Sequence, residues 1–298
     1  MKICILLSAY NGEKYIEEQL ESLVGQQEVA ADILVRDDGS SDKTHEILDK
    51  WQNKGLLKWY KGENLGFAKS FMDLVQRAGD YEYYAFCDQD DIWLPEKLKR
   101  AVDMLSKIEN DIKLYCSNVY YYKNGKTYGG IHKQAPVFDK YTSMVRNIAP
   151  GCSMVFSRRL KDLLAAAPPR RLIAHDFWIF QSAMLLGEVV YDFTPTMLYR
   201  QHDNNQIGQK VGRLDIWKRR IKHLLNKNRR HEREQQAKEI LYCFGDILPA
   251  ESRSICSVVT SYRESLKDKI VFFSDGRYTM GSTLRNLYLR LRIIFNMI

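Results

Sequence analysis

Short apolar runs alternate with amphipathic stretches along the first hundred residues of the chain. Within residues 13–25, for example, Ile16, Leu20 and Leu23 recur at helical spacing. Alternation of this kind predicts an α/β fold, in which helices cover both faces of a mostly parallel sheet. The runs expected to form strands are residues 2–8, 32–36, 56–60 and 83–87.

Polar residues follow three of these expected strands at the point where each strand ends. Ser8 and Tyr10 close the first strand, Asp37 and Asp38 follow the second, and Asp-Gln-Asp-Asp at 88–91 follows the fourth. In open α/β sheets, ligands bind beyond the carboxyl ends of the strands. A capped turn would explain Asp37 and Asp38 taken alone. The recurrence at one edge indicates a binding site.

The carboxylates at 88–91 are the most informative of these groups. Residues i and i+2 of an extended chain point the same way, so Asp88 and Asp90 can converge. Oxygen ligands of this kind suit Mg²⁺ or Mn²⁺, which usually also hold substrate phosphates. Asp91 is alternatively a cap for the helix expected near Pro95. The chain has no GxxxxGK[ST] or GxGxxG motif to support a kinase or a dinucleotide-binding enzyme.

The order of several segments resembles that of family 2 glycosyltransferases with the GT-A fold. These segments are SAYNGEKYIEEQLESL, VRDDGSSDKTHEIL, ENLGFAKSF and FCDQDDIWLPEKL. Three later ones are similar to bacterial rhamnosyltransferases that build cell-wall and O-antigen polysaccharides: APGCSMVFS, AHDFWI and LYRQHDNNQIG. The resemblance implies a Rossmann-like GT-A domain, which binds nucleotide-diphospho-sugars, over residues 1–208. A basic, mainly helical extension would occupy residues 209–298.

The resemblance also implies roles for single residues. Asp176 would be the catalytic base, and Asp88 and Asp90 would hold a divalent metal, Mn²⁺ or Mg²⁺, with His202 as a further ligand. An N-terminal helix cap is the alternative for Asp176, and a surface position is the alternative for His202. The residues expected to contact the donor are Ser8, Tyr10, Asp37, Asp38, Lys69, Asp88 and Arg200, and those expected near the acceptor are Gly151, His175 and Trp178. Trp178 has the core as its alternative.

A single base is enough for an inverting transfer, because it takes the proton of the acceptor hydroxyl while the nucleoside diphosphate leaves on the opposite side. Glycosidases, by contrast, need two flanking carboxylates. The resemblance thus implies a metal-dependent inverting glycosyltransferase that moves L-rhamnose from dTDP-rhamnose. A UDP-hexose is the alternative donor, since the motifs do not encode the sugar. A nucleotidyltransferase, which would release pyrophosphate, is a further alternative.

The excess of positive charge is concentrated in the second half of the chain. The whole chain has 45 Lys and Arg against 37 Asp and Glu, and residues 209–234 alone have ten against three. Apolar residues interleave with these cations, and the pattern recurs in residues 284–298. Interfacial helices on anionic lipid have this pattern, as do helices that pack on a domain with solvated basic faces. A nucleic-acid-binding protein is the rival from another class.

No apolar run reaches the roughly 18 residues of a membrane-spanning helix. We therefore expect a cytoplasmic protein, peripheral at the inner face of the cell membrane. Its expected partners are a nucleotide-sugar, a lipid-linked glycan acceptor and a possible second copy of the chain, with no nucleic acid.

Overall fold

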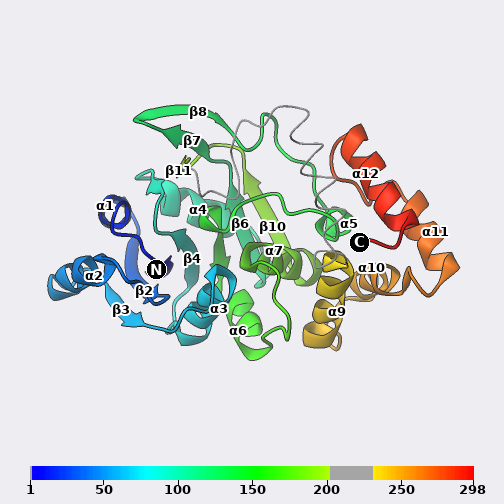
Figure 1. Ribbon diagram of the computed structural model, residues 1–298, viewed down its shortest axis with the longest axis horizontal. Coiled ribbons are helices and arrows are strands. Elements are labelled where there is room, and N and C mark those ends of the chain that lie inside the picture. The colour runs from blue at the N-terminus through cyan, green and yellow to red at the C-terminus, as the bar shows by residue number, and fades with distance from the viewer. Residues whose placement is uncertain (1, 202–230) are drawn as a thin grey trace.

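The computed structural model describes residues 2–201 and 231–298 and has the expected α/β fold (Figure 1). The strands of its central sheet are β1 (Lys2–Ala9), β2 (Ala30–Asp37), β3 (Lys58–Lys61), β4 (Tyr83–Asp88), β6 (Lys113–Ser117), β9 (Val155–Ser157) and β10 (Glu188–Asp192). They lie in the order β10-β6-β9-β4-β1-β2-β3. All neighbours pair in parallel except β9, which is antiparallel to β4 and β6.

Helices cover both faces of this sheet because successive residues of a strand point in opposite directions. In β1, Ile5 and Leu7 belong to one buried cluster, whereas Cys4 and Leu6 belong to the other. Residues of α1 (Ile16–Val24), α2 (Thr44–Asn53) and α4 (Lys97–Leu105) complete the first cluster. Residues of α3 (Phe67–Arg77), α6 (Arg158–Ala166) and α7 (His175–Leu186) belong to the second.

A second sheet lies above the carboxyl edge of the first in the view of Figure 1. Its strands are β5 (Ile92–Trp93), β7 (Tyr120–Lys123), β8 (Lys126–Gly130) and β11 (Met197–Arg200), in the order β5-β11-β7-β8. β5 begins directly after residues 88–91. The loop that contains the acidic residues therefore runs from the central sheet into the second sheet and is held at both ends.

Two stretches that read as continuous strands are interrupted. The run at 112–122 splits into β6 and β7, which belong to different sheets. Between them, the backbone N–H of Asn118 donates to the carbonyl of Asp192 (2.9 Å), and its side-chain oxygen accepts from the Val119 N–H (3.0 Å). In the other run, Gly151–Ser153 form a 3₁₀ turn before β9, and the Ser153 hydroxyl donates to the Pro150 carbonyl (2.8 Å).

The C-terminal region is helical, as expected. Its helices are α9 (Glu232–Phe244), α10 (Ala250–Ser261), α11 (Leu266–Ser274) and α12 (Thr283–Ile294). They share the second buried cluster with α7, where the ring of Phe244 stacks on Trp178 at 5.7 Å between centroids. The expected domain boundary at residue 208 and most of the basic segment 209–234 lie outside the described residues.

Candidate active site

A cleft of about 560 Å³ opens at the carboxyl ends of β1 and β4. It brings together eight of the residues predicted from the sequence: Ser8, Tyr10, Asp38, Asp88, Asp90, Gly151, His175 and Asp176. Asn64, Gly66, Phe67, Phe71, Gln89, Pro150, Ala174 and Tyr199 complete the lining. The eight predicted residues come from five separate parts of the sequence, and the fold brings them to one place.

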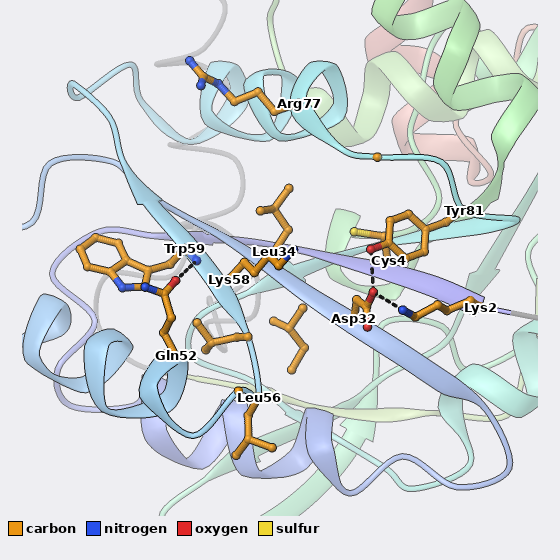
Figure 2. A pocket seen from close by; sticks show the side chains of 14 residues that line it. Lys2, Cys4, Asp32, Leu34, Gln52, Leu56, Lys58, Trp59, Arg77 and Tyr81 are labelled. Atoms are coloured by element: carbon orange, nitrogen blue, oxygen red, sulfur yellow. Dashed lines mark hydrogen bonds and ion pairs between the residues drawn. The ribbon is translucent and has the colours of Figure 1, made fainter.

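A larger cavity, of about 930 Å³, lies at the opposite edge of the sheet (Figure 2). Among its described lining residues only Asp32 is acidic, and that carboxylate is already engaged by Lys2 (2.6 Å) and by the hydroxyl of Tyr81 (2.7 Å). The cavity offers no cluster of acids for a metal or a base. We therefore place the candidate active site in the smaller cleft.

The floor of the cleft beside β2 is fixed by Asp38 and Arg36. The Asp38 carboxylate accepts from the N–H groups of Leu65 and Gly66, both at 2.9 Å, and pairs with the Arg36 guanidinium. Arg36 is 2% exposed and also binds Asp73 (2.9 Å), so its charge lies between two carboxylates. Arg36 is not among the residues predicted from the sequence. A charged residue inside an expected buried strand nevertheless indicates that it needs a charged partner nearby.

Asp37 lies behind this floor and shapes the loop after β2. Its carboxylate accepts from the N–H groups of Gly39 (3.1 Å) and Ser40 (3.0 Å) and contacts a ring nitrogen of His45 at 2.6 Å. It is fully buried and outside the lining of the cleft. Its observed contacts are thus with the protein's own loop.

Gln89 joins the loops that follow β1 and β4. Its side-chain NH₂ donates to the Tyr10 carbonyl (2.9 Å), and its side-chain oxygen accepts from the Tyr10 N–H (2.8 Å). A Cβ at Gly12 would stand 2.3 Å from that oxygen, so a larger residue at 12 would displace the Gln89 side chain from this contact. This paired contact holds Tyr10 at the rim of the cleft. Sequence reasoning did not single out Gln89.

The carboxylates after β4 are crowded. Potential ligand atoms of Asp88, Asp91 and Cys152 lie within 4.8 Å of one another. Asp91 is 1% exposed, and its Oδ2 has no hydrogen-bond partner within the described part of the chain. Burial and the neighbouring Asp90 raise the pKa of Asp88 to about 7, and burial together with Asp90 and Asp88 raises the pKa of Asp91. A divalent cation fits beside Asp88, because it would neutralise part of this crowded negative charge. Asp90 lines the cleft with Asp88 but is not a member of the close group, whereas Asp91 belongs to the group and lies outside the described lining.

Asp176 lies in the first turn of α7 on the other side of the cleft. Its oxygens accept from the Asn147 side-chain amide (2.9 Å) and from the Phe177 N–H (2.7 Å). Burial raises the pKa of Asp176, and these two hydrogen bonds and the charge of Arg233 oppose that rise. A carboxyl held in this way is suited to accept a proton.

His175, the residue before Asp176, is buried at the start of α7. Its ring stacks on Phe71 at 4.0 Å, and neither ring nitrogen has a hydrogen-bond partner in the described residues. Burial lowers the pKa of His175 to about 3, so the ring is neutral. A Cβ at Gly151 would stand 2.3 Å from the Nε2 of His175, so the 3₁₀ turn can approach the ring only with glycine at 151.

Three other predicted residues lie outside the described lining, and His202 lies outside the described residues. Arg200 donates from Nε to the Asp90 carbonyl (2.7 Å) and pairs with Glu18 (2.5 Å), so it braces the carboxylate loop from behind. Lys69 is on the exposed side of α3. Trp178 is in the core, where it is 1% exposed.

Comparison of the chain with known proteins identifies its family. Residues 4–164 match the model of glycosyl transferase family 2. The dTDP-rhamnosyl transferase RfbG of Shigella flexneri is 33% identical over 69% of this chain and 74% of its own length.

Solved structures support the same fold. Staphylococcus aureus TarS 1-349 in complex with UDP-GlcNAc is 20% identical, with a TM-score of 0.58 over 98% of this chain and 79% of that one. The mannosyltransferase PcManGT of Pyrobaculum calidifontis, in complex with GDP-Man and Mn²⁺, has a TM-score of 0.54 at 16% identity, over 99% and 86%. The chain belongs to glycosyl transferase family 2 and is a glycosyltransferase with a GT-A fold.

Proposed function

We propose that this enzyme is a metal-dependent, inverting rhamnosyltransferase that moves L-rhamnose from dTDP-rhamnose to a lipid-linked glycan. The observation that carries the proposal is the lining of one cleft, in which two neighbouring carboxylates (Asp88, Asp90) and a separate carboxylate (Asp176) border the same space. The similarity to RfbG, a dTDP-rhamnosyl transferase by name, supports the choice of donor.

The nucleotide would bind between the ends of β1 and β2. Ser8 and Tyr10 would line its pocket. Asp38, which Arg36 holds in a fixed position, would recognise the nucleotide's base. The Ser8 hydroxyl is fixed by the Ser70 hydroxyl at 2.6 Å, which reduces the ordering needed when the donor binds. Lys69 remains our prediction for a phosphate contact.

Asp88 and Asp90 would hold Mn²⁺ or Mg²⁺, with His202 as a further ligand. Bound there, the metal supplies positive charge to the diphosphate leaving group. The chain's own contribution is the position of the loop, because Arg200 binds the carbonyl of Asp90 and the N–H of Arg200 donates to Asp91 (3.0 Å).

Asp176 would act as the general base of the transfer. It accepts the proton of the acceptor hydroxyl while that oxygen forms a bond to the anomeric carbon of the sugar. The bond from that carbon to the donor phosphate oxygen breaks, and dTDP leaves with the electron pair. Because attack and departure occur on opposite faces, the anomeric configuration inverts. Gly151 and His175 hold the acceptor side of the cleft in shape.

Calorimetric titration of the donor tests this proposal. We expect Mn²⁺-dependent binding of dTDP-rhamnose, with weaker binding of UDP-glucose, UDP-galactose and GDP-mannose. Asp90→Asn should lose the metal dependence, whereas the exposed control Asp103→Asn should bind like the wild type. Preference for a UDP-hexose would discard rhamnose and keep the reaction class. Binding that ignores both metal and Asp90→Asn would overturn the assigned site.

A further inference from the structure

The two C-terminal helices expose several large apolar side chains. On α11 the side chains repeat at helical spacing, as do those on α12, so each helix presents one stripe. The members are 40–74% exposed: Leu266, Ile270 and Phe273 on α11, and Leu284, Leu287, Leu291, Ile294 and Phe295 on and just after α12. We call this set the C-terminal ridge. Contiguous apolar patches of this kind mark interaction sites.

The ridge is additional to the face with which α12 packs on the protein. Leu289 and Ile293, on the other side of the same helix, are buried in the second core cluster. Arg290 ties α12 to α11 by donating to the carbonyls of Phe272 (2.7 Å) and Asp275 (3.0 Å). Both helices are therefore held in place without burying the ridge.

The charges around the ridge are mostly positive. Residues 266–294 contain six Lys and Arg against two acids, and both acids are engaged, Asp275 by Arg277 (2.7 Å) and Asp268 by the Ser261 hydroxyl (2.7 Å). Residues 276–298 contain four arginines and no acid. Lys267 and Arg285, each adjacent in sequence to a ridge leucine, are exposed.

The positive charge around the C-terminal ridge indicates which kind of partner would bind there. Pairing of the ridge with a second copy of itself would place like charges opposite one another, which is unfavourable. An anionic lipid surface instead accepts the apolar side chains below its headgroups and the cations at its headgroups.

The length of the helices fixes how they would meet a bilayer. No helix in residues 2–201 or 231–298 is long and apolar enough to cross a membrane. The 12 residues of α12 measure only ~18 Å against a hydrocarbon core of about 30 Å. A helix of this length with one apolar stripe lies in the plane of the interface.

The loop that leads into α12 contacts a residue next to a hydrogen-bond partner of Asp176. Just before α12, the carbonyl of Met280 accepts from Arg146 (3.5 Å). The residue after Arg146 is Asn147, whose amide binds Asp176. Figure 1 shows α11 and α12 at one end of the molecule and α1 and α2 at the other.

We propose that the C-terminal ridge docks this enzyme on the surface of an anionic bilayer. The contact needs neither donor nor metal, so it is tested independently of the proposed reaction.

Vesicle co-sedimentation of the full chain at low salt tests it. We expect binding to phosphatidylcholine vesicles that contain about 30 mol% phosphatidylglycerol, and much less to phosphatidylcholine alone. Leu287→Glu with Leu291→Glu should weaken binding at least about tenfold. Lys267→Gln with Arg285→Gln should weaken it roughly fivefold or more on the anionic vesicles.

The matched control is Val24→Glu with Leu56→Glu, which adds the same charge at exposed apolar positions of other elements. It should bind at least two- to threefold more tightly than the ridge variant, because only repulsion weakens it. Unchanged donor titration and melting temperature show that each variant is folded. Wild-type protein that ignores anionic vesicles, or a ridge variant that binds as well as its control, would overturn the proposal. So would a dimer in light scattering that the ridge variant dissociates, with no vesicle binding.

Discussion

The side-chain amide of Asn147 donates a hydrogen bond to Oδ2 of Asp176 across 2.9 Å. This bond favours the charged form of a carboxyl whose pKa burial raises. Asn147 therefore keeps the proposed base ready to accept a proton, although it lies 29 residues away in sequence.

Asn147→Ala should move the acid limb of the pH profile. Below its pKa, Asp176 carries a proton and cannot accept another, so activity falls as the pH drops through that pKa. Loss of the hydrogen bond raises the pKa further, and the fall should move to higher pH by about one unit. The pH dependence of kcat/KM measures the shift. The exposed control Asn53→Ala should leave the profile in place, and an unmoved limb in Asn147→Ala would contradict the role of the amide.

Arg36→Met should destabilise the fold strongly. It removes the cation from between Asp38 and Asp73 and leaves Asp38 buried without its charge partner. The expected loss in the free energy of unfolding is about 3–5 kcal/mol. Arg77→Met is the matched control, since Arg77 binds the same Asp73 from a 62% exposed position. It should cost less than about 1 kcal/mol. Urea unfolding curves compare the two, and equal losses would show that burial of Arg36 does not matter.

Gly151→Ala should impair transfer more than donor binding. Its Cβ would stand 2.3 Å from the His175 ring and would displace the start of α7, where Asp176 lies. We expect kcat to fall by about tenfold or more, with the donor Kd within twofold. Gly276→Ala is the control, because apart from its chain neighbours no atom of the described residues lies within 4 Å of a Cβ there. A variant with wild-type kcat would mean that the turn and the ring are free to adjust.

The paired contact between Gln89 and Tyr10 gives a prediction about the donor side. Gln89→Leu removes both hydrogen bonds to the Tyr10 backbone, and the rim of the nucleotide pocket should loosen. We expect the Kd of the donor to rise about tenfold, from roughly 1–1.5 kcal/mol of lost preorganisation. Gln52→Leu, which alters a residue of the cavity in Figure 2, should leave the donor Kd unchanged. Calorimetry measures the donor Kd of both variants. Equal donor Kd values would show that the contact between Gln89 and Tyr10 does not contribute to donor binding.

Much of the fold follows from local sequence pattern. The alternation of β-branched runs and helical periodicity is a property of neighbouring residues, and the strands and helices of residues 2–105 lie close to where it places them. The interruption at Asn118 was not predictable, because it depends on the carbonyl of Asp192, which is remote in sequence. The 3₁₀ turn at Gly151–Ser153 was likewise not predictable, because its residue types continue the apolar run of the strand that follows.

The same distinction applies to the candidate site. Asp88, Asp90 and Asp176 belong to motifs that can be recognised in the sequence, and the structure brings them to one cleft. The grouping of Asp91 and Cys152 with Asp88 arises only when β9 packs beside β4. Arg200 is expected from the sequence to contact the donor, whereas its contacts with Glu18 and the Asp90 carbonyl depend on the second sheet. Such long-range pairings have no local signature.

Transfer by Asp176→Asn tests the central claim most directly. Wild-type enzyme, dTDP-rhamnose, Mn²⁺ and a lipid-linked glycan extract are incubated, and acceptor-dependent release of dTDP is measured. Since general-base catalysis contributes about 10²–10⁴-fold, Asp176→Asn should lower the rate by that factor while the donor Kd stays within twofold. An Asp176→Asn enzyme that transfers rhamnose at the wild-type rate would contradict the assignment of the base and, with it, the mechanism built on this cleft.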